Sequence, residues 1–278
     1  MTVSMIVLDL DGTLLDSGKR ISQANREVLA RAAELGTWIV PSTGRFYDGM
    51  PRTVRELPYV RYVITVNGAQ LYDAAERREL GAWNIPPETA DSVFAALDAL
   101  PCIYDCYMDG WGWMDRKMYE QAEKFAYGPH ELRMLRELRR PVENFRSFIR
   151  QTGHGVQKIQ MFFADMDARA AAYRELKACF PGLNVTSSIA NNIEINSAEA
   201  TKGAALRRLC ELLKVPREGV LAFGDGLNDV TMLREAGVGI AMANASPEVR
   251  AAADEVTADN DHDGVARAIW KYLPHEEK

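Results

Sequence analysis

The amino-acid sequence predicts an α/β fold in which an open parallel sheet is interrupted by an inserted α+β domain. Near the N-terminus, short apolar runs alternate with an amphipathic helical pattern, an order that is typical of parallel sheets. This alternation stops near residue 82 and is again clear from Thr201 onward. We therefore expect a discontinuous core domain of residues 1–82 and 188–278 and an inserted domain of residues 83–187.

The N-terminal part of the core is expected to begin with a strand buried on both faces, because residues 5–8 form an unbroken apolar run. A helix follows, with Ser22 as its N-cap, one apolar face and Gly36 at its end. Two more strands are predicted at residues 38–40 and 62–66. Strands separated in this way by helical segments favour parallel pairing.

The inserted domain is expected to start with a helix after Pro86 and to contain an aromatic hairpin. Asp109 and Gly110 join the predicted strands 103–107 and 111–114, and this dipeptide is a strong signal for a two-residue hairpin turn. The aromatic residues are expected to pack between the sheet and its helices. Further helices and strands are predicted at residues 118–126, 130–139, 158–163, 168–180, 184–187 and 193–196.

The C-terminal part of the core repeats the alternation of helix and strand. A leucine-bearing helix after Thr201 precedes an apolar strand at residues 220–223. Another helix and a strand at residues 238–242 follow. Ser246 and Pro247 then suit the N-cap and the first position of a short helix.

The bulk composition excludes several classes of function. A length of 278 residues with 47% hydrophobic and 26% charged residues is ordinary for a globular protein, and the net charge of −6 argues against a nucleic-acid partner. No apolar stretch approaches the roughly 18 residues of a membrane helix, and the N-terminus shows no secretory leader. We expect a cytoplasmic protein with no membrane partner, either a monomer or a dimer.

Four cysteines are too few to form a disulfide framework in a chain of this size. Cys102 and Cys106 lie in an apolar, strand-like run, and no His or Cys pair follows at a spacing that suits zinc. Buried thiols are therefore expected at both positions.

Two aspartates at the end of the first strand are the strongest functional signal in the chain. Asp9 and Asp11 follow the apolar run and precede Gly12, which allows a tight turn. If the extended backbone continues through them, both carboxylates project to one side and Leu10 to the other. Such close negative charges repel, and a divalent cation relieves the repulsion. The pair predicts a Mg²⁺ site with one carboxylate ready as a nucleophile, although Asp-Gly is also a common turn dipeptide.

Polar residues also follow the other predicted core strands. Thr43, Asn67, Asp225 and Asp229 stand where strands end, and in an open parallel sheet these ends form the crevice that binds ligands. Thr-Gly and Asn-Gly pairs are each ordinary turn sequences as well. Asp225 and Asp229 are a stronger signal, because two acids four residues apart would add carboxylates to a Mg²⁺ site at the first strand.

Lys202 is predicted in the first turn of a helix, where the helix dipole disfavours a cation. An exposed surface position is one explanation, since lysine is mostly exposed. Beside the free backbone N–H groups of a helix start, however, its charge would suit a bound phosphate. Together with the acidic residues, Lys202 predicts a site for a phosphoryl group and Mg²⁺.

Four segments of the chain occur in a characteristic order: Asp9–Thr13, Ser42–Arg45, Lys202–Gly203 and Gly224–Asp229. They resemble the four signature motifs of the haloacid dehalogenase superfamily. More narrowly, the chain resembles the Cof-type phosphatases of type IIB, which carry a large α/β cap (C2 cap), through the size and position of the insert. The three segments that carry this narrower resemblance are Thr43–Arg45, Asn67–Ala69 and Ala241–Ala245.

The resemblance implies a Rossmann-like three-layer core, an inserted cap domain and a two-step phosphoryl transfer. Asp9 would attack phosphorus and form an aspartyl-phosphate, and Asp11 would act as general acid and base. The residues implied to hold the phosphoryl group or substrate are Thr43, Lys202, Gly44, Arg45, Asn67 and Asn228. The implied ligands of Mg²⁺ are Asp9, the backbone carbonyl of Asp11, Asp225 and, through water or as a support, Asp229.

The implied activity is Mg²⁺-dependent hydrolysis of small phosphorylated metabolites, such as sugar phosphates or similar monoesters. One alternative is a phosphomutase or phosphotransferase that uses the same intermediate. Another is a non-catalytic sensor of a phosphorylated metabolite, which would be marked by loss of Asp9, Asp11 or Lys202, and all three are present. A dehalogenase would need neither Mg²⁺ nor the second acid. No Gly-x-Gly-x-x-Gly follows the first strand, so a nucleotide-binding oxidoreductase is not expected.

Overall fold

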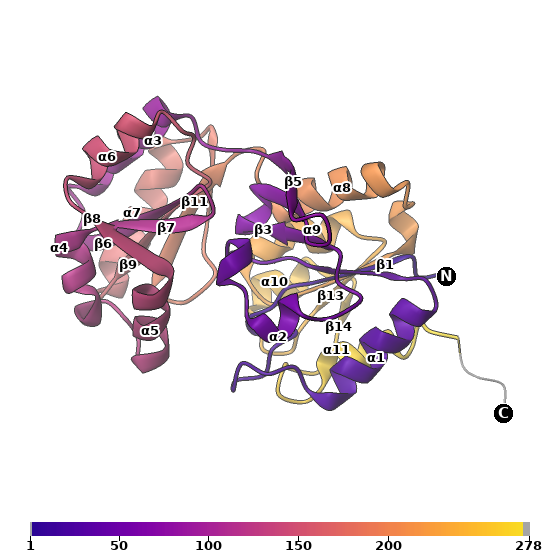
Figure 1. Cartoon of the computed structure of the whole chain (residues 1–278). Coiled ribbons are helices and arrows are strands. Elements are labelled where there is room, and N and C mark those ends of the chain that lie inside the picture. Colours follow the sequence, from indigo (N-terminus) through magenta and orange to yellow (C-terminus); the bar gives the residue numbers. More distant parts are fainter. Residues whose placement is uncertain (1, 275–278) are drawn as a thin grey trace. The chain divides into compact units, whose positions relative to one another are not determined.

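The structure of the chain, a computed structural model, describes residues 2–274 without the side chain of His130. Contacts between residues divide this part of the chain into two units (Figure 1). Unit 1 comprises residues 2–45, 50–81 and 201–274, and unit 2 comprises residues 46–49 and 82–200.

Unit 1 contains a five-stranded parallel sheet with the order β14-β13-β12-β1-β2. The first strand, β1, is fully buried along its whole length because helices cover both faces of the sheet, as its apolar run predicts. The five strands are β1 (Met5–Leu8), β2 (Trp38–Pro41), β12 (Val220–Gly224), β13 (Val238–Ala241) and β14 (Glu255–Val256).

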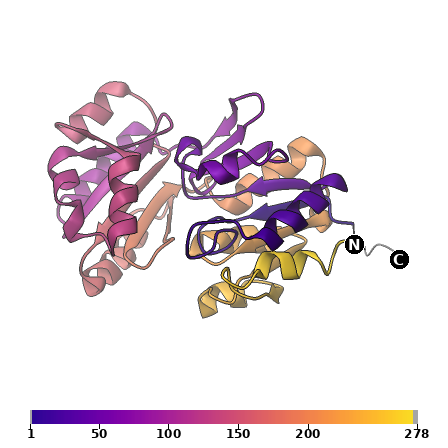
Figure 2. The same ribbon diagram turned by 60° about the horizontal axis from the view of Figure 1, so that its bottom comes forward.

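Helices pack on both faces of this sheet (Figures 1 and 2). Helices α1 and α11 contact each other on one face, and α8 and α9 contact each other on the other. The predicted N-caps are confirmed, since Ser22 Oγ accepts from Asn25 N–H and Ser246 Oγ accepts from Val249 N–H. The helices of unit 1 are α1 (Gln23–Glu34), α2 (Arg52–Arg55), α8 (Lys202–Leu213), α9 (Val230–Glu235), α10 (Pro247–Ala251) and α11 (Gly264–Ile269).

The strand predicted at residues 62–66 forms, but it belongs to a different sheet. Strand β3 (Tyr62–Thr65) pairs antiparallel with β4 (Gln70–Asp73), and β5 (Arg78–Ala82) completes this three-stranded sheet. Only isolated parallel bridges, such as Ser42 to Ile64, join β3 to β2. The tight turn after β3 reverses the chain at once, so β3 pairs with its immediate successor β4 along one edge.

Unit 2 is built on a six-stranded sheet with the order β10-β11-β9-β6-β7-β8. The predicted hairpin is confirmed: Asp109 and Gly110 have φ angles of 54° and 75° between two antiparallel strands. The strands are β6 (Cys102–Met108), β7 (Trp111–Asp115), β8 (Arg139–Val142), β9 (Lys158–Phe163), β10 (Leu183–Thr186) and β11 (Asn192–Ser197). The helices are α3 (Pro87–Leu97), α4 (Arg116–Glu120), α5 (Pro129–Leu138), α6 (Phe145–Thr152) and α7 (Met166–Cys179).

Unit 2 continues to Ala200, beyond the boundary predicted at residue 187. The reason is that β11 pairs with both β9 and β10 of the unit 2 sheet. The helix predicted over residues 118–126 is shorter than expected, because α4 ends at Glu120 and a 3-10 turn at Ala122–Lys124 follows. Strand β8 and helix α6 were not predicted.

The cysteines are free thiols. Cys102 and Cys106 lie in the hydrophobic core of unit 2, which confirms the prediction of buried thiols. Burial raises the pKa of Cys106 well above its ordinary value. Cys210 is buried as well, whereas the side chain of Cys179, at the end of α7, is exposed.

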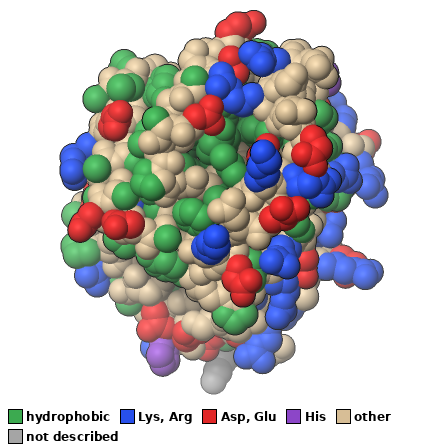
Figure 3. All heavy atoms as spheres, turned by 90° about the vertical axis from the view of Figure 1, so that its left-hand side faces the viewer, with side chains coloured by type: hydrophobic (Ala, Val, Ile, Leu, Met, Phe, Trp, Pro, Cys, Tyr) green, Lys and Arg blue, Asp and Glu red, His purple; other side chains and the backbone are tan. Residues whose placement is uncertain are grey.

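The surface of unit 2 carries charges of both signs. On the face drawn in Figure 3, Lys and Arg side chains lie interspersed with Asp and Glu side chains. Among residues 2–274, no helix has the length and apolar content needed to cross a membrane.

Two ion pairs are buried within unit 2. Arg139 Nε donates to Asp105 Oδ2 at 2.9 Å, and Lys158 Nζ to Glu194 Oε1 at 2.7 Å, with all four side chains at most 2% exposed. The Tyr107 ring lies 5.0 Å from the Arg139 guanidinium and 4.6 Å from Lys158 Nζ. Because water does not reach these charges, each depends on its partner for stabilisation.

Arg139→Met is therefore expected to destabilise the protein by about 3 kcal/mol, since it leaves the buried carboxylate of Asp105 without its cation. Urea unfolding at neutral pH measures this change. Arg116→Met is the matched control in the same unit: it breaks an ion pair with Glu143 whose side chains are 46% and 64% exposed. Its expected cost is below about 1 kcal/mol. If both variants lowered the free energy of unfolding equally, the importance assigned to burial of the ion pair would be contradicted.

Candidate active site

Three strands of the parallel sheet end at one place in unit 1. Leu8 of β1 is aligned with Phe223 of β12 and with Pro41 of β2. The residues that follow leave the sheet together, and backbone bonds extend the alignment: Asp9 N–H donates to Phe223 O at 3.0 Å, and Ser42 N–H to Leu8 O at 2.7 Å. The carboxyl ends of parallel strands thus bring the first, second and fourth sequence segments to a common edge.

Lys202 completes this edge from helix α8. Its side chain is fully buried, and its Nζ donates to Asp9 Oδ1 at 2.6 Å, to Asp229 Oδ1 at 2.5 Å and to Ser42 O at 3.0 Å. Burial alone would lower the pKa of Lys202, but the carboxylates of Asp229 and Asp9 outweigh it and raise the pKa above its ordinary value. The lysine is therefore a permanent cation at the site.

Both carboxylate oxygens of Asp229 accept hydrogen bonds. Its Oδ2 accepts from the backbone N–H groups of Asp225 at 3.0 Å and Gly226 at 2.9 Å, while Oδ1 accepts from Lys202. A Cβ at position 224 would collide with Asp229, so only glycine allows this close approach. Asp229 thus shapes the loop that carries Asp225.

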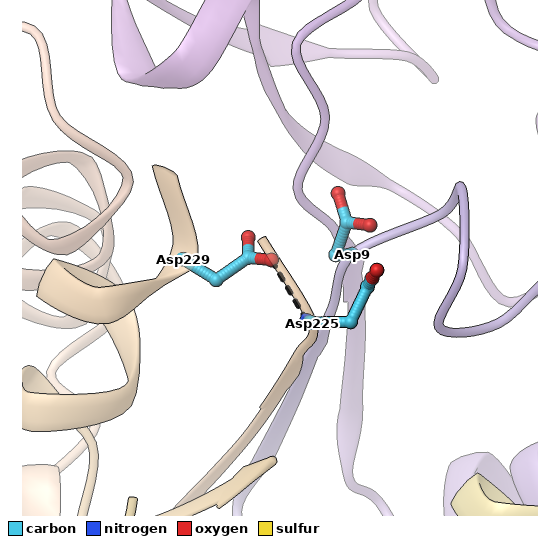
Figure 4. Close-up of side chains that lie close together, drawn as sticks. All are labelled: Asp9, Asp225 and Asp229. Atoms are coloured by element: carbon cyan, nitrogen blue, oxygen red, sulfur yellow. Dashed lines mark hydrogen bonds between the residues drawn. The ribbon is translucent and has the colours of Figure 1, made fainter. Parts of the chain in front are cut away.

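Asp9, Asp225 and Asp229 form a cluster in which one oxygen from each lies within 4.8 Å of the others (Figure 4). Burial, reinforced by Asp229 and Asp225, raises the pKa of Asp9 well above its ordinary value even though Lys202 opposes the shift. Burial, reinforced by Asp229, raises the pKa of Asp225 to about 7. The three carboxylates face one cation, Lys202, and their hard oxygen donors fit Mg²⁺.

The segment after Asp9 holds Asp225 in place. Thr13 Oγ1 donates to Asp225 Oδ1 at 2.7 Å. Gly12 has a φ of 88°, and a Cβ there would collide with Asp225 Oδ2. The glycine is required both for its left-handed backbone and for this contact.

Asp11 does not join the acidic cluster. Strand β1 ends at Leu8 and the backbone turns at Leu10, so the alternation expected for an extended strand does not continue through Asp11. Arg45 donates to both oxygens of Asp11, at 2.8 and 2.9 Å, and Lys19 Nζ donates at 2.8 Å. Burial acts to raise the pKa of Asp11, but Arg45 and Lys19 outweigh it and lower the pKa to about 2.

The remaining predicted residues lie around the same edge. Thr43 is 2% exposed, and its Oγ1 accepts from Arg45 N–H at 3.2 Å across the intervening Gly44. Asn67 is 1% exposed, and its Oδ1 accepts from Asn228 Nδ2 at 3.0 Å. These residues come from the loops after β2, β3 and β12.

Several contacts at the site were not expected from the sequence, among them Arg45 with Asp11 and Asn228 with Asn67. Thr13 binds Asp225, Lys19 binds Asp11, and the carbonyl of Ser42 binds Lys202. Thr13 belongs to the Asp9–Thr13 segment, so its hydroxyl is a signal that the sequence offers. Lys19 lies eight residues beyond Asp11, directly before Arg20, and has a left-handed φ of 60°; no sequence pattern marks it as a partner of Asp11.

A family model, similar proteins and a solved structure all match this chain over nearly its whole length. A family model described as haloacid dehalogenase-like hydrolase matches residues 6–269. Two similar proteins, each 30% identical, are a 5-amino-6-(5-phospho-D-ribitylamino)uracil phosphatase, YcsE, of Bacillus subtilis (strain 168) and a pyridoxal phosphate phosphatase, YbhA, of Escherichia coli (strain K12). The matches cover 98% of this chain with 96% of the first protein and 100% of the second. A solved haloacid dehalogenase-like hydrolase from B. subtilis is similar with a TM-score of 0.83 at 28% identity, covering 98% of this chain and 100% of that one.

The raised pKa of Asp225 predicts how stability depends on pH when divalent ions are removed with a chelator. Between about pH 4 and pH 7 the folded protein retains a proton on Asp225 that the unfolded chain releases, so the free energy of unfolding should fall as pH rises through this window. Asp225→Asn should make this fall shallower, while the raised pKa of Asp9 retains part of it. Urea unfolding at several pH values measures it, with Asp167→Asn at an exposed position as control. The same pH dependence in Asp225→Asn and wild type would contradict the assignment.

Proposed function

We propose that this chain, a phosphatase that belongs to the haloacid dehalogenase-like hydrolase family, hydrolyses small phosphorylated metabolites through a phosphoryl group carried on Asp9. The observation that supports this most directly is the placement of the Asp9 carboxylate. It lies at the common edge of the strands, is 7% exposed and is bound at 2.6 Å by Lys202, beside two further carboxylates. A carboxylate so oriented suits in-line attack on phosphorus.

The proposed reaction has two steps. In the first, an oxygen of Asp9 forms a bond to phosphorus while the bond from phosphorus to the substrate oxygen breaks, and that oxygen leaves with a proton. In the second, water attacks the phosphorus of the aspartyl-phosphate and restores the free carboxylate with release of inorganic phosphate. Lys202 keeps Asp9 fixed through both steps.

Mg²⁺ is the proposed cofactor, with Asp9, Asp225 and the backbone carbonyl of Asp11 as its ligands. Bound there, the ion would neutralise charge between the anionic nucleophile and the anionic phosphate. Asp229 already accepts from two backbone N–H groups and from Lys202, which favours a supporting role for it.

Asp11 is the proposed general acid and base. As an ionised carboxylate held by Arg45 and Lys19, it is first able to accept a proton rather than to donate one. To protonate the leaving oxygen, Asp11 must first take up a proton from solvent, which requires that it lose the contact with one of these cations. Lys19 makes a single contact and its side chain is 34% exposed, whereas Arg45 makes two contacts and is 13% exposed. We therefore assign this loss of contact to Lys19.

The proposed phosphoryl-binding residues are those with donors near the same edge. Thr43 is assigned to the phosphoryl oxygens, together with the backbone of Gly44 and the amide of Asn228. Lys202 is assigned to the phosphoryl group through its charge, since its three N–H groups already donate to Asp9, Asp229 and Ser42. Arg45 and Asn67 were also predicted to touch the substrate, but their side chains are bound to Asp11 and to Asn228. For these two residues the contacts favour a supporting role.

Small phosphomonoesters are the proposed substrate class. The names of the two relatives specify phosphomonoesters of quite different small molecules, a ribitylaminouracil and pyridoxal. What these compounds share is the phosphate ester itself, and the residues described above are those that would bind it.

The proposed function is tested by assaying release of inorganic phosphate from a panel of phosphorylated metabolites, with and without added alcohol acceptors. Hydrolysis without an acceptor supports the phosphatase assignment. A rate that depends on an acceptor would instead support the phosphotransferase or mutase alternative. Saturable binding of a metabolite without any turnover would favour the sensor.

Asp9→Asn is expected to lower kcat by more than about 10³-fold, because it removes the nucleophile while keeping the side-chain volume. Steady-state kinetics with p-nitrophenyl phosphate measure the loss, and thermal unfolding shows whether the variant still folds. Asp167→Asn makes the same chemical change at an exposed position and should keep wild-type activity. Chelation of divalent ions should abolish wild-type turnover and added Mg²⁺ should restore it. Appreciable activity of folded Asp9→Asn would remove the nucleophile assignment.

A further inference from the structure

The turn after β3 has an unusual backbone. Val66, Asn67 and Gly68 have φ angles of 52°, 59° and 93°, so three consecutive residues are left-handed. Asparagine and glycine tolerate this conformation, but a β-branched valine does so only when surrounding contacts enforce it. Val66 is fully buried, which supplies such contacts.

Hydrogen bonds attach this turn to the loop that follows β2. Val66 N–H donates to Arg45 O and Asn67 N–H donates to Thr43 O, each at 3.0 Å. On another side the turn lies against the start of α8, since a Cβ on Gly68 would collide with Thr201 O. The turn is thereby fixed relative to both Thr43 and Lys202.

The side chain of Asn67 extends this support to the loop after β12. Its Oδ1 accepts from Asn228 Nδ2 at 3.0 Å. An amide group has a donor end and an acceptor end, and a bond to one end decides which way the group faces. With Oδ1 of Asn67 as its partner, Asn228 must keep its NH₂ end on this side.

We propose that Asn67 is a positioning residue that holds the amide of Asn228 with its N–H groups, rather than its oxygen, toward the phosphoryl-binding site. The inference rests on the phosphatase function proposed above and deepens it. The NH₂ group has two hydrogens, and the bond to Asn67 uses one and leaves the other for a phosphoryl oxygen. A reversed amide would direct its oxygen at the anion and repel it.

Direct binding of phosphate by Asn67 is disfavoured by the same contacts. Its side chain is almost completely buried, and its Oδ1 accepts a hydrogen bond from Asn228 Nδ2. A phosphoryl oxygen is also an acceptor. It would compete with Asn67 Oδ1 for an N–H of Asn228 and would not bind to Asn67 Oδ1 itself. Asn67 therefore acts through Asn228.

A double-mutant cycle tests the proposal, with inorganic phosphate as a competitive inhibitor of p-nitrophenyl phosphate hydrolysis. Asn67→Gly keeps a residue that accepts the left-handed backbone and removes only the side chain. It should raise the inhibition constant about 3- to 10-fold, the effect of one hydrogen bond. Asn228→Ala should raise it at least as much. The double variant should equal Asn228→Ala alone. In Asn67→Gly, KM should rise by the same factor while kcat changes less.

Additive losses in the double variant, or an unchanged inhibition constant in Asn67→Gly, would overturn the proposal. If Asn67→Gly does not fold, Asn67→Asp keeps both the accepting oxygen and the tolerance for left-handed backbone. In the Asn67→Asp variant, the added change Asn228→Ala should raise the inhibition constant of phosphate by the same factor as it does in wild type. A smaller factor would again overturn the proposal. Failure of the proposed function itself would show differently, as a wild-type protein that neither hydrolyses phosphomonoesters nor is inhibited by phosphate.

Discussion

The geometry of the site depends on the hydrogen bonds of one fully buried ammonium group, that of Lys202. It joins three pieces of chain that are far apart in sequence, through Asp9, Asp229 and the carbonyl of Ser42. Each carboxylate is shielded from water, so removal of the cation would leave charges whose burial costs about 3 to 5 kcal/mol. The lysine therefore stabilises the strand ends in the arrangement that the proposed chemistry requires.

The surroundings of Asp9 and Asp11 shift the pKa values of these two aspartates in opposite directions. Asp9 is buried among carboxylates, which raises its pKa, whereas Asp11 is bound by Arg45 and Lys19, which lower its pKa. Pairs of acids whose surroundings separate their pKa values are a common arrangement for dividing catalytic roles. The backbone turn at Leu10 makes the division possible, because it carries the two side chains into different surroundings.

Much of the fold and part of the site could be predicted from the sequence. The α/β class and the family resemblance are confirmed, because buried apolar runs, helix caps and glycine-bearing loops are local signals. The clustering of Asp9 with Asp225 and Asp229 follows from strand ends meeting at one edge, which is a rule of parallel sheets. The direction of the Asp11 side chain could not be predicted. A shift of one residue in the end of the strand is enough to change it. The contacts of Lys19 and Ser42 depend on tertiary placement, and so does the pairing of β11 that extends unit 2 to Ala200.

The distribution of thiols has a practical consequence. Among the described residues, Cys179 is the cysteine with an exposed side chain, while Cys102, Cys106 and Cys210 are buried and burial raises the pKa of each. A maleimide dye should accordingly attach at a single position in the unmodified protein. That position is at the end of α7 in unit 2, outside the unit that holds the residues assigned to the reaction, so the wild-type chain can carry one label without engineering.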